Sequence, residues 1–188
     1  MIPILLKILK TGIVTEAAPA AREEWRTRAI AIQREILRLL GRALVIRMVD
    51  AGSCNGCELE IQALGNPYYN LEGLGIRFAA SPRHADLLLV TGPVSKHMEM
   101  ALRAAYEAMP APKLVVAIGD CGRDGGIFGA GYATCGGVSQ VLPVDVVVPG
   151  CPPPPSAVLQ GILTAIQGGR SAPGAAAAEP TRLEPSPR

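Results

Sequence analysis

Four of the chain's five cysteines occupy positions from which they could hold a metal centre. Cys54 and Cys57 form a Cys-x-x-Cys pair, and Cys121 and Cys151 each follow a separate run of apolar residues. Four thiolates brought to one place are an iron–sulfur ligand set, although a structural zinc ion could use the same four. Cys135 lies within a glycine-rich stretch, and we expect it to be a small buried apolar residue. The alternative is that Cys135 is a ligand in place of one of the other four.

The apolar runs before these cysteines predict the strands of one sheet. Strands are expected at residues 43–49, 75–79, 86–91, 113–118 and 144–148, and helices at 58–64, 95–109 and 156–166. Buried strands that alternate with helices are typical of a doubly wound α/β domain with a mostly parallel sheet. Ligands of such sheets bind beyond the carboxyl ends of the strands, where Cys54, Cys121 and Cys151 fall. The sequence therefore predicts that the thiols meet at one rim.

The residues beside the cysteines favour iron and sulfur over zinc. Gly56, Gly119 and Gly150 allow tight turns that bring backbone N–H groups near sulfur. Pro152 follows Cys151, as a proline follows the last cysteine of a bacterial ferredoxin motif. Structural zinc sites commonly use two close cysteine pairs, whereas this chain has one. A thioredoxin-like Cys-x-x-Cys pair would leave the other two cysteines unexplained.

The composition limits the class of protein. With 188 residues, 49% of them hydrophobic and 18% charged, we expect one globular domain with extensions. A net charge of +2 without a basic cluster argues against nucleic acid as a partner. An odd number of widely spaced cysteines favours a reducing compartment over a disulfide scaffold. No phosphate-binding loop and no complete acid–base or nucleophile set is apparent, so we expect no catalytic site within this chain.

Three segments are expected along the chain. Residues 1–42 are predicted to form an amphipathic helical arm, residues 43–168 the α/β domain, and the Pro- and Ala-rich residues 169–188 a disordered tail. The arm carries two apolar stripes at helical spacing: Ile2, Leu5, Leu6, Leu9 and Ile13, then Trp25, Ala29, Ile32, Ile36 and Leu40. It would dock on a membrane surface or a partner subunit, unless it packs on its own domain. No apolar run approaches the roughly 20 residues that a spanning helix needs.

Four linked motifs resemble one family of proteins. In order they are C-N-G-C-E-L-E, S-P-R-H-A-D-L-L-L-V-T-G, G-D-C-G with G-G-I-F, and P-V-D-V-V-V-P-G-C-P-P. They are similar to the small subunit of membrane-bound, energy-converting nickel–iron hydrogenases of the formate hydrogenlyase type, and to the homologous cluster-bearing subunit of respiratory complex I. The resemblance covers residues 45–166. It implies a flavodoxin-like fold and one 4Fe–4S cluster on the residues that match Cys54, Cys57, Cys121 and Cys151.

The resemblance also implies a function and partners. The chain would be an electron-transfer subunit on the cytoplasmic side of the cell membrane, with a large catalytic subunit, a ferredoxin-like iron–sulfur subunit and integral membrane subunits. The spaced C-N-G-C favours the hydrogenase branch, because complex I subunits place two cysteines side by side. A complex-I-like NADH or ferredoxin:quinone oxidoreductase is the alternative, and a zinc-stabilised scaffold is an alternative of another class. Glu60 matches a glutamate of the family motif and is a candidate proton relay; Glu58 is weaker, because acids are common in a helix's first turn.

Overall fold

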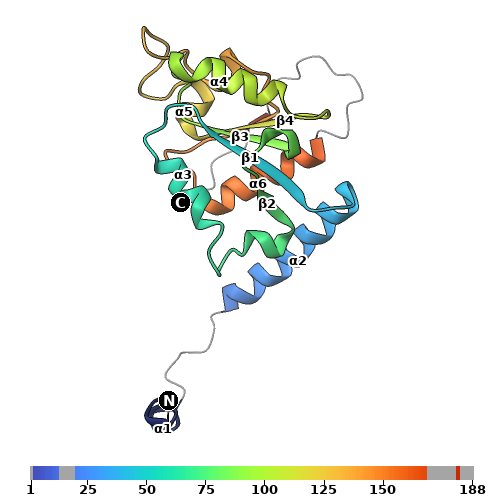
Figure 1. Cartoon of the computed structure of the whole chain (residues 1–188), viewed down its shortest axis with the longest axis vertical. Helices are drawn as coiled ribbons and strands as arrows, with labels where there is room; N and C mark the ends of the chain where they lie inside the picture. The colour runs from blue at the N-terminus through green and yellow to red at the C-terminus, as the bar shows by residue number, and fades with distance from the viewer. Residues whose placement is uncertain (1, 13–19, 169–180, 183–188) are drawn as a thin grey trace.

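A parallel β-sheet forms the centre of the chain. The computed structural model describes residues 2–12, 20–168 and 181–182, and its strand order is β2-β1-β3-β4-β5-β6 (Figure 1). The strands are β1 (Leu44–Asp50), β2 (Ile76–Phe78), β3 (Leu87–Thr91), β4 (Leu114–Ile118), β5 (Val146–Val148) and β6 (Thr181–Arg182). Every pairing between them is parallel, and the first five strands follow the flavodoxin order. The predicted doubly wound α/β fold is therefore confirmed.

Helices cover both faces of this sheet. One face carries α2 (Ala20–Leu40), α3 (Gly56–Ala63), α6 (Pro155–Gly168) and the short 3-10 turn η1 (Leu71–Leu74). The other carries α4 (Lys96–Glu107), α5 (Gly119–Asp124) and the 3-10 turn η3 (Val138–Gln140), and Figure 1 shows α4 and α6 on opposite sides of the strands. A helix α1 (Ile2–Thr11) precedes them, and a further 3-10 turn, η2 (Pro82–His84), leads into β3.

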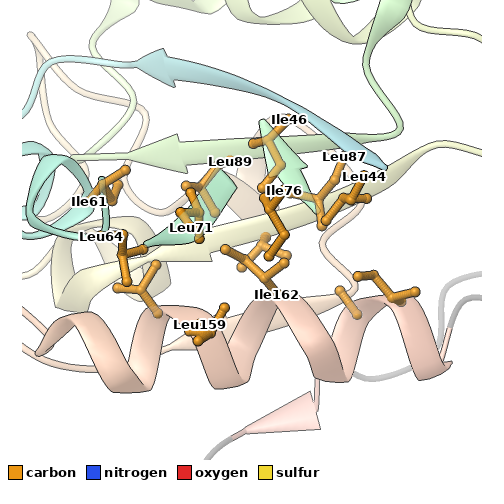
Figure 2. Close-up of a cluster of buried hydrophobic side chains, with 14 of the residues drawn as sticks. Leu44, Ile46, Ile61, Leu64, Leu71, Ile76, Leu87, Leu89, Leu159 and Ile162 are labelled. Carbon is orange, nitrogen blue, oxygen red and sulfur yellow. The ribbon is translucent and has the colours of Figure 1, made fainter. Parts of the chain in front are cut away.

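Alternate side chains of each strand enter two separate cores. In β3, Leu87 and Leu89 belong to the core under α6, while Leu88 and Val90 belong to the core under α4, and all four are fully buried. Figure 2 shows the first core, in which strand side chains face Leu159 and Ile162 of α6. Successive strand residues point to opposite faces, so a strand covered on both sides needs a continuous apolar run.

Each strand and helix expected in the α/β domain is present, with ends that differ from the expected ones by at most two residues. The second expected helix of the arm is also present as α2, and its Ile36 is 1% exposed in the first core, with Ile32 and Leu40 packed against that core. The side chains of Trp25 and Ala29 lie outside the described part. Residues 169–180 and 183–188 of the expected tail also lie outside the described part. Residues 181–182 of the same tail form β6.

Candidate metal centre

The turn after β1 positions the first two cysteines. The Oδ1 atom of Asp50, the last residue of β1, accepts hydrogen bonds from the backbone N–H groups of Gly52 and Ser53 at 2.8 and 2.7 Å. This turn directs the chain into Cys54 and then into the first turn of α3, which contains Cys57. Asp50 therefore shapes the loop that carries both thiols.

The loops that carry the other two cysteines are tied together. Cys121 lies in α5, directly after β4, and Cys151 lies just beyond β5. The backbone N–H of Asp120 donates to the carbonyl of Gly150 at 2.8 Å, and the N–H of Gly150 donates to Asp120 Oδ1 at 3.2 Å. Arg123 Nη1 lies 2.9 Å from the same Oδ1. These contacts hold two neighbouring strand ends, and with them two thiols, at one edge of the sheet.

Two glycines bring the backbone directly against sulfur atoms. A Cβ on Gly119, which has a φ of +82°, would lie 2.8 Å from Cys57 Sγ and 3.2 Å from the carbonyl oxygen of Gly150. A Cβ on Gly126, with a φ of +54°, would lie 2.9 Å from Cys121 Sγ. A side chain at either position would displace a thiol, and the left-handed backbone is itself unfavourable for other residues. We name Gly119 and Gly126 the glycine cradle.

The thiols of the rim act on one another electrostatically. Burial, then the carboxylate of Glu58, then the other three thiols raise the pKa of Cys57 from 9.0 to about 12. Burial, followed by Cys151 and Cys54, likewise raises the pKa of Cys121. Cys54 and Cys151 are exposed, and all five cysteines are free thiols. All three of the other thiols act on Cys57, as thiols delivered by neighbouring strand ends would, and their role as ligands stays a prediction.

Cys135 lies apart from this group. Its thiol donates to Glu99 Oε2 at 3.4 Å, and its side chain packs against the core under α4. Burial and the Glu99 carboxylate raise its pKa, and it does not contribute to the shift at Cys57 or Cys121. Cys135 is part-buried where we expected a buried apolar residue, and its carboxylate partner is a contact that the sequence did not reveal.

The two acids of the C-E-L-E segment have different surroundings. Glu58 is 3% exposed, and within the described part of the chain neither of its carboxylate oxygens has a hydrogen-bond partner. Glu60 is half-buried and acts on Tyr69, whose pKa is raised by burial, then by Tyr68, then by Glu60. The proton-relay role of Glu60 stays a prediction. Of these two acids, the one that acts on a thiol of the rim is Glu58, which is adjacent in sequence to Cys57.

The raised pKa of Cys57 predicts a pH dependence in the cluster-free protein. Because the folded-state pKa lies above 9.0, the stability that this thiol contributes is present below pH 9 and is lost as the pH rises towards 12. We expect alkylation of Cys57 by iodoacetamide to rise only at higher pH than in the urea-unfolded chain, as measured by peptide mass spectrometry. Glu58→Gln should move that profile to lower pH, whereas equal folded and unfolded profiles would contradict the prediction.

The donor set and the cradle fit an iron–sulfur cluster. Four thiols can supply all four protein ligands of a 4Fe–4S cluster. Backbone amides close to the sulfurs can donate hydrogen bonds, which adjust the reduction potential of such a cluster. Among residues 2–12, 20–168 and 181–182, no three His, Cys, Asp or Glu side chains are spaced to hold a single metal ion. None of the described helices is both long and apolar enough to cross a bilayer.

Similarity to known proteins adds to this geometry. The chain is 43% identical over 133 residues to a probable membrane-bound hydrogenase subunit of Pyrococcus furiosus, covering 71% of this chain and 80% of that protein. It is 42% identical over 135 residues to formate hydrogenlyase subunit 7 of Escherichia coli, covering 72% of this chain but only 53% of that protein. It is 48% identical over 124 residues to an NADH-quinone oxidoreductase subunit of Desulfovibrio desulfuricans, covering 65% and 66% of the two chains.

Solved structures show the same fold. A chain of an archaeal membrane-bound sulfane sulfur reductase matches with a TM-score of 0.62 and 33% identity, over 76% of this chain and 77% of that one. A chain of an NAD⁺-reducing nickel–iron hydrogenase matches with a TM-score of 0.51, but at 19% identity it supports the fold alone. The family described as "NADH ubiquinone oxidoreductase, 20 Kd subunit" matches residues 54–165, which contain all four thiols of the rim. The chain belongs to this family of oxidoreductase subunits.

Proposed function

We propose that this chain is the electron-transfer subunit of a multisubunit, membrane-associated hydrogenase and carries one 4Fe–4S cluster. Cys54, Cys57, Cys121 and Cys151 would be the ligands. The observation that carries the proposal is the convergence of these four thiols at one rim of the sheet, two of them against the glycine cradle. The family match over residues 54–165 supports it independently.

The chain's own residues would hold and insulate the cluster, which when bound supplies one-electron transfer between neighbouring centres. The thiols must lose their protons to become ligands, so assembly should release protons and be favoured by higher pH. The hydrogen bonds between Asp120 and Gly150 keep two ligand loops in register. The chain would act within an oxidoreductase as an electron relay, and the chemistry of the substrate would take place in a partner.

Exposed apolar side chains beside the rim support a partner that covers it. Leu59, two residues after Cys57, is 58% exposed, and Ile127, next to Gly126 of the cradle, is 92% exposed. Large apolar side chains grouped around a functional rim are typical of an interaction surface. We propose that a large catalytic subunit covers this rim, with a ferredoxin-like iron–sulfur subunit and integral membrane subunits in the same assembly, on the cytoplasmic side of the membrane.

Two observations favour the hydrogenase branch. The cysteine pair is spaced as C-N-G-C, and two of the relatives are described as hydrogenase or formate hydrogenlyase subunits. The 48% identity to the NADH-quinone oxidoreductase subunit of Desulfovibrio desulfuricans makes a quinone-linked complex the second candidate. The assembled complex separates them: hydrogen turnover without a quinone requirement supports the first, and quinone-dependent turnover without hydrogen activity supports the second.

The cluster itself is tested on the purified full chain. After anaerobic reconstitution with iron and sulfide, we expect about four iron atoms per chain and an electron paramagnetic resonance signal that appears on reduction. A parallel sample receives zinc in place of iron. A chain that takes up zinc stoichiometrically and no iron would contradict the proposal and favour a zinc-stabilised scaffold.

A further inference from the structure

We propose that helix α1 binds the surface of an anionic phospholipid bilayer. The described residues 3–12 are all exposed, in contrast to α2, whose apolar stripe enters the first core. The large apolar side chains of α1 stay accessible to the following extents: Ile4 65%, Leu5 59%, Leu6 61%, Ile8 59% and Leu9 79%. The chain therefore presents an apolar helix face that nothing in its own described fold covers.

The shape of this face fits a bilayer better than a helical partner. At 3.6 residues per turn, the five large apolar side chains occupy an arc of about 200° around the helix. Ile4 and Leu6 lie at the two limits of this arc, and the other three lie between them. A seam that packs against one or two other helices needs a narrower stripe. A wide aliphatic arc with a polar remainder is the pattern of a helix that lies in the interfacial plane, its apolar side among the acyl chains.

The charges of α1 select the kind of lipid. Lys7 and Lys10 lie together on the polar side, Lys10 is in the last turn, and no Asp or Glu occurs in the helix. Each lysine near an anionic surface strengthens binding by roughly fivefold. A zwitterionic surface offers the same acyl chains without that attraction. The expected ligand is therefore a bilayer that contains anionic headgroups.

This inference goes beyond electron transfer and does not require a bound cluster. A peripheral subunit with its own lipid contact would help to keep the thiol rim at a fixed height above the membrane. If so, variants without cluster ligands, such as Cys121→Ser, should bind vesicles as well as the unmodified chain does. Failure of the cluster proposal and failure of the lipid proposal are thus distinguished by the same set of proteins.

The test is flotation of the purified full chain with vesicles of phosphatidylcholine and phosphatidylglycerol, beside vesicles of phosphatidylcholine alone. We expect binding to the mixed vesicles that weakens with salt. The double variant Leu5→Glu, Leu9→Glu should lose it. The double variant Lys7→Gln, Lys10→Gln should bind the mixed vesicles at least about tenfold more weakly, since two lysine contributions are removed.

Two matched controls change the same residue types elsewhere. Met100→Glu removes another exposed apolar side chain and Lys96→Gln removes an exposed lysine, both in α4; both variants should float like the unmodified chain. Absence of flotation with mixed vesicles, or flotation that the α1 variants leave unchanged, would overturn the proposal. Concentration-dependent self-association that Leu5→Glu abolishes, without vesicle binding, would instead assign α1 to contact with a second copy.

Discussion

Replacement of Cys121 or Cys151 by serine is expected to abolish the 4Fe–4S cluster, whereas Cys135→Ala should retain it. Cys121 and Cys151 lie on loops joined by the Asp120–Gly150 hydrogen bonds and act electrostatically on the Cys57 thiol. Mutations of residues that merely support a metal ligand cost about 10–100-fold in affinity, so loss of a ligand should cost more than about 100-fold. Iron content and the visible absorbance of the reconstituted full chain measure the effect.

Cys135→Ala is a suitable control because it removes a cysteine without removing a proposed ligand. Its thiol bonds to Glu99, which keeps its ion pair with Arg103 at 3.0 Å after the substitution. Loss of one part-exposed hydrogen bond should lower the free energy of unfolding by about 1 kcal/mol or less. If Cys135→Ala bleaches the protein while Cys121→Ser keeps its iron, the ligand assignment is wrong and the fourth thiol comes from the other loop.

The strands and the position of the thiols could be predicted because both follow from long-range regularities. A strand buried on both faces must be apolar over most of its length, as β3 is at residues 87–90, and its carboxyl end then determines where the next residues lie. The short helix α5 was not predicted. Its six residues, Gly-Asp-Cys-Gly-Arg-Asp, include two glycines, which are poor helix formers, so contacts with β4, β5 and η3 stabilise it.

Helix α3 shows why the surroundings of the site were harder to predict. Glu58 is 3% exposed and Leu59 is 58% exposed, the reverse of what side-chain polarity favours. The burial of Glu58 beside Cys57 depends on how α3 packs over the rim. The local sequence pattern does not predict this packing. The exposure of Leu59 is explained if a partner covers it in the assembled complex. Both departures from the simple pattern occur within two residues of a proposed ligand, where functional sites most often break local rules.

Gly119→Ala is expected to reduce cluster occupancy strongly and to destabilise the cluster-free fold. The substitution combines two effects at one position of the glycine cradle. A φ of +82° is unfavourable for alanine by about 1–2 kcal/mol. In addition, the new Cβ would lie 2.8 Å from Cys57 Sγ, so the thiol or the backbone must move. A ligand displaced by even a fraction of an ångström leaves the productive geometry of a metal site.

Gly75→Ala separates these two effects, because Gly75 has a φ of +80° but no atom within 4 Å of the position its Cβ would occupy. Both variants should lose a similar amount of stability from backbone strain, and Gly119→Ala should lose more through the contact with Cys57. Only Gly119→Ala should also lose iron. Thermal unfolding of the cluster-free chains measures the stability, and iron per chain after reconstitution measures the cluster.

Equal iron in both variants would contradict the prediction. It would mean that the backbone at Gly119 does not determine where the Cys57 sulfur lies, and that the glycine cradle shapes the turn but not the metal centre.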